Sequence, residues 1–152
     1  MKLKNKLIIL IFILIGGCGY QPLLTSNKMG DFYIKNINFT GDKELNNFLK
    51  INLKKYSENT VGEKIQVDVN TEYYKNEISK NASGSVAKFE ITAKAVFFVT
   101  DQNSQKNKII INESFTMDRQ DDLNSEIRYE RIIKQNFASS ISNKLIIELI
   151  KK

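Results

Sequence analysis

Apolar and polar residues alternate with the two-residue period of a strand over residues 31–40, which predicts the first element of the chain. One face of this predicted strand carries Tyr33, Ile37 and Phe39, and the other carries Asn36 and Asn38. Gly41 and Asp42 follow and mark a turn, with Asp42 placed to cap a helix.

A helix is predicted over residues 43–57, because the spacing of apolar residues changes there to that of an amphipathic helix. The residues of its apolar stripe are Leu45, Phe48, Leu49, Leu53 and Tyr56. Lys50, Lys54 and Lys55 take the opposite side. We interpret this lysine face as solvated surface.

Strict alternation returns in residues 64–74 and predicts a second strand with one buried and one wet face. The residues predicted to face the core are Ile65, Val67, Val69, Thr71 and Tyr73, and those predicted to face water are Gln66, Asp68, Asn70 and Glu72. Residues 75–85 are polar and are predicted to form a long link. A third strand follows over residues 87–99, with Ala87, Phe89, Ile91, Ala93, Ala95, Phe97 and Val99 inward and Lys88, Glu90, Thr92 and Lys94 outward.

A turn over residues 101–107 and a fourth strand over residues 108–117 are predicted next. The inward residues of that strand are Ile109, Ile111, Phe115 and Met117. A final helix, capped by Asn124 or Ser125, is predicted to run to about Ile150. Its apolar stripe comprises Ile133, Phe137, Ile141, Leu145 and Leu149, with Ala138 and Ile127 alongside.

The predicted order is therefore β-α-β-β-β-α. Neither helix can bury its stripe alone, and the sheet offers one apolar face, so the economical solution is a two-layer α+β sandwich. We predict two helices packed on one face of a four-stranded sheet.

The segment before the first strand has the layout of a lipoprotein signal peptide. Lys2, Lys4 and Lys6 precede an apolar run over residues 7–15, which has nine residues where a bilayer-spanning helix needs about 20. Gly17-Cys18 resembles the bacterial lipobox, which implies cleavage before Cys18 and lipid attachment to it. The alternative is an ordinary signal peptide with an incidental cysteine. We predict a signal peptide (1–17), a lipidated Cys18 with a flexible tether (18–30) and one periplasmic domain (31–152).

Composition limits the partners. The formal charge of +6 includes the three lysines of the predicted signal peptide, so the remainder carries +3. Only three of the 23 basic residues are arginines, whereas nucleic-acid readers favour arginine for its planar, bidentate fork. No nucleic-acid partner is expected. Cys18 is the only cysteine, so no intramolecular disulfide can form.

Catalytic chemistry has few candidates. The chain has no histidine, and its seven glycines form no phosphate-binding loop. The acidic stretch over residues 118–124 has Leu123 where a calcium loop needs glycine. We therefore expect no catalytic residues, no metal and no cofactor. One enzymatic alternative stays open: an envelope hydrolase that uses a carboxylate pair, as in glycan cleavage.

The start of the predicted mature chain, residues 17–23 (GCGYQPL), resembles the LPS-assembly lipoproteins (LptE family) in their short alphaproteobacterial form. Three further segments agree with this resemblance: residues 82–91 before the long third strand, residues 114–116 in the fourth strand, and residues 129–145 of the final helix. In that family the lipoprotein sits inside the LptD β-barrel and supports its assembly for lipopolysaccharide transport to the cell surface.

The resemblance implies a lipid-anchored protein on the periplasmic face of the outer membrane, with an LptD-type barrel and lipopolysaccharide as partners. The wet faces of the second and third strands would supply polar contacts with the barrel lumen. Lysines in or next to the strand connections are candidates for contact with lipopolysaccharide phosphates. They are Lys75, Lys80, Lys106 and Lys108. A structural lipoprotein of another envelope complex is the main alternative.

Overall fold

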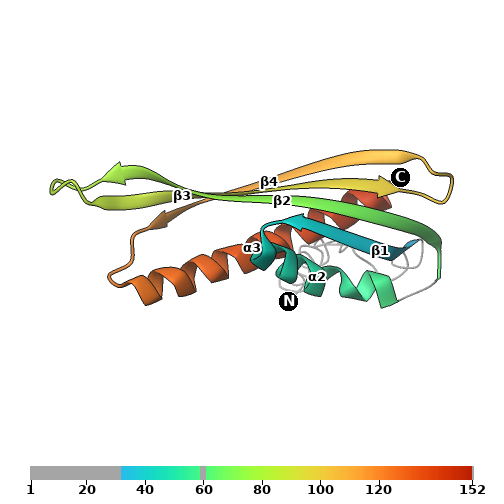
Figure 1. Ribbon diagram of the computed structural model, residues 1–152, viewed down its shortest axis with the longest axis horizontal. Coiled ribbons are helices and arrows are strands. Elements are labelled where there is room, and N and C mark those ends of the chain that lie inside the picture. Colours follow the sequence, from blue (N-terminus) through green and yellow to red (C-terminus); the bar gives the residue numbers. More distant parts are fainter. Residues whose placement is uncertain (1–31, 59–60, 152) are drawn as a thin grey trace, which may run out of the picture.

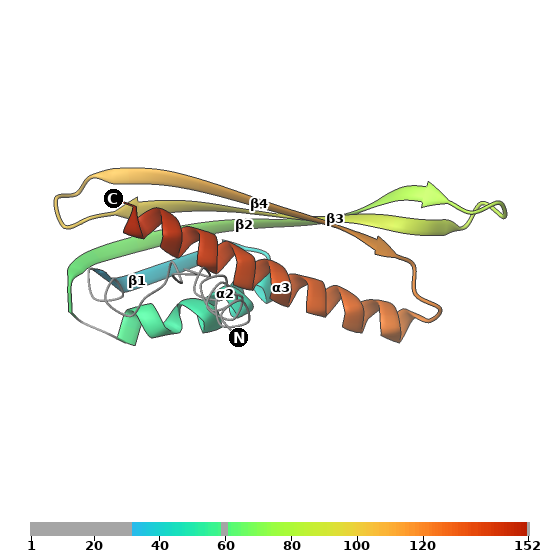
Figure 2. The same cartoon turned by 180° about the vertical axis from the view of Figure 1, so that it is seen from behind.

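The computed structural model describes residues 32–58 and 61–151, which form four strands and two helices. The elements are β1 (Phe32–Gly41), α2 (Lys43–Glu58), β2 (Glu63–Lys80), β3 (Val86–Thr100), β4 (Lys106–Asp118) and α3 (Leu123–Ile150). The sheet order is β1-β2-β3-β4, with β1 parallel to β2 and the other neighbours antiparallel. Both helices lie on one face of the sheet (Figure 1; Figure 2 from behind). The predicted two-layer α+β fold is confirmed. The predictions for residues 1–30 lie outside the described residues.

The core lies between the sheet and the helices, where the predicted apolar stripes meet. Its most buried helix residues include Leu45, Leu49, Leu53, Ile133, Phe137, Ile141 and Leu145, and its strand residues include Val67, Val69, Ile91, Ala93, Ala95 and Phe97. Asp42 caps α2 as predicted, since its Oδ1 accepts a 2.7 Å hydrogen bond from the Leu45 backbone N–H. In α2, β2 and β3 the apolar face thus has the phase that the sequence predicted.

The phase of β1 changes at a bulge. The pairing with β2 shifts between Ile34 and Asn36, so Lys35 has no partner. Phe32 and Ile34 are therefore buried on the same face as the half-buried Ile37 and Phe39. The prediction that Tyr33 shares the face of Ile37 and Phe39 was wrong, because the extra residue reverses the alternation on one side of it.

β2 is longer than predicted, because residues 75–80 continue the strand and the link shrinks to residues 81–85. These residues are mostly polar on both faces, so their pattern resembles a loop, yet their backbone pairs with β3 up to Lys80 opposite Val86. β1 ends much earlier, at Gly41 opposite Thr71. Gly41 has a φ of +96°, and a Cβ there would lie 1.8 Å from the Thr71 carbonyl oxygen, so only glycine fits this exit. The β2–β3 hairpin therefore projects past β1 and α2 (Figure 1).

The start of α3 differs from the prediction in two ways. The helix begins at Leu123 and its cap is Asp122, whose Oδ1 accepts a 2.9 Å hydrogen bond from the Ser125 N–H, so neither Asn124 nor Ser125 is the cap. Ile127, predicted beside the apolar stripe, is 56% exposed. Glu126 and Glu130 instead precede Ile133 on the side of α3 that faces the sheet. There they accept hydrogen bonds from Lys75 and Tyr73 of β2.

In β4, the inward face follows the prediction in part. Ile111 and Met117 are buried and Ile109 is partly buried, whereas Phe115 remains 40% exposed. Phe115 pairs with Ile91 of β3 and makes an edge-to-face contact with Tyr129 of α3, with ring centroids 6.3 Å apart. Phe115 thus faces the helix layer near the projecting hairpin, where that layer covers it incompletely.

Candidate functional site

The four lysines predicted to contact lipopolysaccharide do not form one site. Lys80 is the last residue of β2, beside the 81–85 loop, whereas Lys106 and Lys108 begin β4 at the other end of β3. Since β3 has 15 residues, these two groups lie about 45 Å apart. Lys108 places its Nζ 5.8 Å from the centre of the Phe98 ring. Lys75 does not lie in a connection at all, because it is inside β2.

Lys75 points toward α3 and joins the hairpin to that helix. Its Nζ donates hydrogen bonds of 2.8 Å to Glu126 Oε1 and 2.9 Å to Glu130 Oε2, and it lies 4.4 Å from the centre of the Phe89 ring. The side chains of Lys75 and Glu126 are only 23% and 14% exposed. Charged groups that are this close together and shielded from bulk water attract each other more strongly than pairs on the surface do. Lys75 is therefore a structural cation between two layers.

The same cluster continues toward α2. Tyr73 Oη donates a 2.9 Å hydrogen bond to Glu130 Oε1, and the Lys134 Nζ lies 4.1 Å from the centre of the Tyr73 ring. Lys134 Nζ also donates to Glu44 Oε2 at 3.1 Å and lies 3.6 Å from Asp42 Oδ2. We call these seven residues the polar cluster: Asp42, Glu44, Tyr73, Lys75, Glu126, Glu130 and Lys134. It connects both helices to β2 where β1 has already ended.

The charges of the polar cluster stabilise one another. Burial alone would lower the pKa of Lys75, but its hydrogen bonds to Glu126 and Glu130 outweigh this and raise the pKa. The hydrogen bond from Lys75 lowers the pKa of Glu126. Burial and the hydrogen bond to Glu130 raise the pKa of Tyr73. These shifts keep Lys75 and Glu126 charged at neutral pH and Tyr73 a neutral donor.

The face of the sheet opposite the two helices is formed by strands alone, and we call it the outer face. Neither α2 nor α3 covers it, as Figures 1 and 2 show. The residues predicted to face water on β2 and β3 all lie on this face. Two cross-strand ion pairs lie among them, Lys94–Glu72 at 3.6 Å and Lys88–Asp118 at 3.5 Å. The face thus combines both signs of charge at short spacing.

Apolar side chains interrupt this polar face. Tyr74, Phe98 and Ile110 are 54%, 42% and 50% exposed. Ile110 pairs with Val96, and Val96 is two residues before Phe98 on the same face, so Ile110, Val96 and Phe98 form one apolar patch. Tyr74 lies apart from it, opposite Thr92. The exposure of Phe98 and Ile110 was not predicted from the sequence. The signal was available, because both fall out of phase with the inward residues of their strands.

Catalytic chemistry finds little support in the described ranges. No group of three or more potential metal-ligating residues is found within residues 32–58 and 61–151. The carboxylates of Glu126 and Glu130 lie on successive turns of α3 but share the Lys75 ammonium. The lowered pKa of Glu126 is opposite to what a general acid in glycan cleavage needs. As to membrane spans, neither α2 nor α3 is long and apolar enough to cross a bilayer.

Comparisons with known proteins give matches in structure and none in sequence. No protein-family model and no curated protein sequence matches the chain. Among solved structures, rare lipoprotein B from Shewanella oneidensis superposes with a TM-score of 0.58 at 12% identity, over 76% of this chain and 94% of that one. Lipoprotein B from Nitrosomonas europaea, described as uncharacterized, superposes with a TM-score of 0.52 at 10% identity, over 85% of this chain and 90% of that one.

These matches define a class of fold, that of small α+β lipoprotein domains. The particular fold is that of rare lipoprotein B, the LptE fold. The resemblance drawn from the sequence is confirmed at this level. Identities of this size establish the shared fold alone.

Proposed function

We propose that this chain is an outer-membrane lipoprotein that supports the assembly of an LptD-type β-barrel and plugs it during lipopolysaccharide transport. The observation that carries this proposal is the outer face. On the rare lipoprotein B fold, it presents a wide sheet surface that neither α2 nor α3 covers and that mixes charged side chains with exposed Tyr74, Phe98 and Ile110. The lumen of such barrels is polar, and interfaces are anchored by aromatic side chains within a polar rim.

The projecting hairpin supports the same function. Its 81–85 loop is ordered by Asn81, whose Oδ1 accepts hydrogen bonds from the Ser83 and Ser85 N–H groups at 3.1 and 2.9 Å. The polar cluster fixes the hairpin against α3. A plug needs such a pre-organised shape, because side chains that are already ordered lose less entropy on binding. The function requires no chemical step, so we propose a non-enzymatic role.

The test is capture of the barrel from membranes by tagged protein, with charges reversed on one face at a time. Lys88→Glu with Lys94→Glu places like charges across the interface and is expected to abolish capture, since such contacts cost several kcal/mol. Lys43→Glu with Lys55→Glu changes the charge equally on α2 and is expected to leave capture intact. If the unsubstituted protein captures no LptD-type barrel and its depletion leaves surface lipopolysaccharide normal, the chain serves another envelope complex.

The lipid anchor is part of this proposal. Cleavage before Cys18 would leave a cysteine carrying acyl chains, and each buried CH₂ contributes about 0.8 kcal/mol to membrane attachment. Cys18→Ala is expected to prevent incorporation of labelled palmitate and to release the mature domain from the membrane. A Cys18→Ala protein that still incorporates palmitate would contradict the lipobox assignment.

Contact with lipopolysaccharide is proposed for the exposed lysines Lys80, Lys106 and Lys108, whose ammonium groups are suited to phosphates. Lys75 would have to give up two ion pairs to make such a contact. The lysines near the two ends of β3 would therefore act at separate places along a transported molecule.

A further inference from the structure

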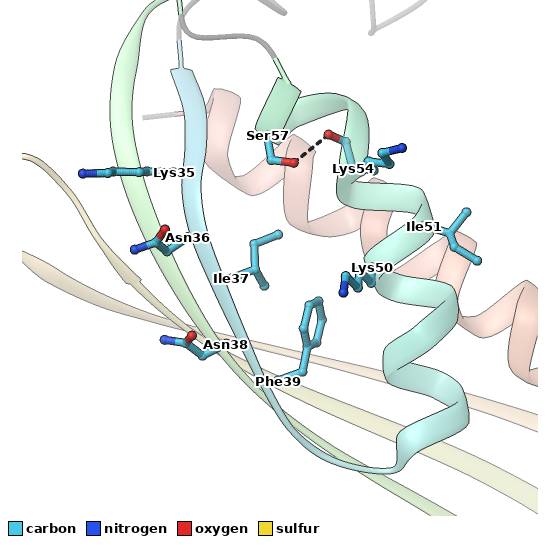
Figure 3. A pocket seen from close by; sticks show the side chains of 9 residues that line it. All are labelled: Lys35, Asn36, Ile37, Asn38, Phe39, Lys50, Ile51, Lys54 and Ser57. Atoms are coloured by element: carbon cyan, nitrogen blue, oxygen red, sulfur yellow. Dashed lines mark hydrogen bonds between the residues drawn. The ribbon is translucent and has the colours of Figure 1, made fainter.

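A groove runs along the free edge of β1, on the side of the molecule away from β4. It has a volume of about 620 Å³ and is bounded by β1 and by the exposed side of α2. Figure 3 shows Ile37 and Phe39 pointing from β1 toward α2, while Lys50 reaches back toward β1. Lys35 lies on the other side of the β1 edge (Figure 3). The groove therefore has an apolar floor of Ile37 and Phe39, with Lys50 beside it and Lys35 on the far side of the β1 edge.

The charge of the groove is one-sided. Among the residues that the structure describes, Lys35, Lys50 and Lys54 line it and no carboxylate does. Lys54 pairs with Glu58 across a 3.3 Å contact whose side chains are 71% and 64% exposed, which leaves the ammonium accessible. Lys35 adds repulsion to a neighbouring lysine, since its proximity lowers the pKa of Lys64. An anion bound beside Lys35 would relieve the repulsion between Lys35 and Lys64.

The apolar part of the groove is also open to a ligand. Ile51 of α2 lines it and is 68% exposed, and Ile37 and Phe39 are only partly buried. An exposed isoleucine beside lysines is typical of surfaces that meet the boundary between lipid headgroups and acyl chains. The long lysine side chains can extend their ammonium groups to phosphates while their methylenes cover apolar surface.

A strand from another protein fits the groove less well than a lipid does. Edge strands that accept a further strand are regular, whereas β1 carries the bulge at Lys35. A lysine at a bulge is one of the usual means of protecting an edge from strand pairing. The bulge in β1 thus disfavours pairing with another strand, whereas the lysine and apolar side chains of the groove favour an anionic amphiphile.

The position of the groove relative to the predicted anchor favours a membrane surface. The described chain begins at Phe32, on the strand that forms the groove, 14 residues after Cys18. Extended, the intervening segment spans at most about 50 Å, so an anchored domain stays close to the bilayer. We propose that the β1–α2 groove docks the domain on that membrane by binding anionic phospholipid headgroups at its lysines and adjoining acyl chains at Ile37, Phe39 and Ile51. This inference rests on the anchor of the proposed function but not on the barrel.

The experiment measures binding to vesicles of phosphatidylcholine with and without phosphatidylglycerol. It uses the chain from residue 19 onward, which keeps every residue of the core and lacks both the apolar run and the lipid. Binding is expected only with phosphatidylglycerol. Replacing Lys35, Lys50 and Lys54 with glutamine is expected to weaken it on the order of 100-fold, since each lysine near an anionic surface contributes about 1 kcal/mol.

The matched control replaces Arg119, Arg128 and Lys144 with glutamine, which removes the same charge from exposed positions next to and on α3. It is expected to weaken binding less than about threefold, because charges beyond a Debye length are screened. Ile51→Ser is expected to weaken binding about tenfold if the isoleucine meets acyl chains. Circular dichroism and thermal unfolding verify that each variant is folded.

Three outcomes would overturn the proposal: no preference for phosphatidylglycerol, equal losses in the two triple variants, or unchanged binding of Ile51→Ser. A fourth would be vesicle binding that appears only when residues 19–31 are removed, because the chain's own tether would then be the occupant. Barrel capture is assayed separately, and the groove variants keep Tyr74, Phe98, Ile110 and the ion pairs of the outer face. Failure of vesicle binding with normal capture therefore refutes the groove alone.

Discussion

Helix α3 contacts the sheet in two different ways along its length. Its second half packs Phe137, Ile141 and Leu145 into the core with 6% exposure or less, whereas its first turns meet β2 through Glu126 and Glu130. The core region, with β1, α2 and the second half of α3, gains stability from burial of apolar surface. The projecting region, with the β2–β3 hairpin and the first turns of α3, adds charges held at short distance to the apolar contacts of Phe89, Met117 and Tyr129.

The difference shows how a small domain can extend a sheet beyond its core. An ion-paired lysine between two carboxylates needs only one strand and one helix. Buried or half-buried ion pairs add little net stability but enforce one geometry, which suits a surface that must match a partner.

The largest effect is expected from breaking the core region. Phe137→Ala removes a side chain that is 6% exposed and should lower the free energy of unfolding by about 3–5 kcal/mol. Denaturant unfolding measures this change. Ile132→Ala, on the same helix at 50% exposure, is the control and should change it by less than about 0.5 kcal/mol. Similar losses in both variants would contradict the observed phase of α3.

A smaller and more local effect is expected in the projecting region. Lys75→Ala leaves Glu126 and Glu130 without their cation and should cost about 1–3 kcal/mol, less than a fully buried pair because water reaches part of the cluster. Hydrogen exchange should increase at residues 123–130 and in the hairpin and stay unchanged in α2. Lys54→Ala, which breaks an exposed pair, is the control. Uniform loss of protection would show that the two regions unfold as one unit.

The two regions also differ in how far the sequence predicts them. The core stripes follow from local periodicity, and every inward residue predicted for α2 lies in or against the core. Lys75 and its partners are 51 and 55 residues apart in sequence, so no local pattern joins them. One clue was available, because Glu126 and Glu130 continue the sheet-facing row of Ile133 and Phe137. Carboxylates in that row require a cation on the sheet.

The errors at β1 and β2 have a related cause. A single bulge residue, Lys35, reverses the alternation without leaving a mark in composition. Residues 75–80 are polar because most of the hairpin is uncovered, and periodicity only detects strands with one apolar face. The turn residues Asn81, Ser83 and Gly84 are the better guide, since they place the reversal at the end of the polar stretch.

Acid should affect the projecting region before the core region. The pKa of Glu126 is lower in the folded chain, so its contribution to stability is present above the unfolded value of about 4.3 and is lost as the pH falls through the folded value. The pKa of Lys75 is raised, so its contribution is intact below about 10.4 and is lost only at higher pH. Hydrogen exchange at residues 123–130 should therefore rise below about pH 4. In Lys75→Ala this acid dependence should shrink, and an unchanged profile would assign it to other carboxylates.

The smallest effect is expected on the outer face, where stability and binding should separate. Lys94→Ala breaks one cross-strand pair whose side chains are 44% and 38% exposed, and should change the free energy of unfolding by less than about 0.5 kcal/mol. Phe98→Ser on the same face should likewise leave the unfolding midpoint nearly unchanged, because Phe98 is already 42% exposed. The two variants should differ in their affinity for the barrel. Lys94→Ala should bind it about as tightly as the parent, whereas Phe98→Ser should bind it at least about tenfold more weakly, because aromatic anchors dominate interface energies. Equal capture by both variants would remove the apolar patch from the interface and leave the charge pattern to define it.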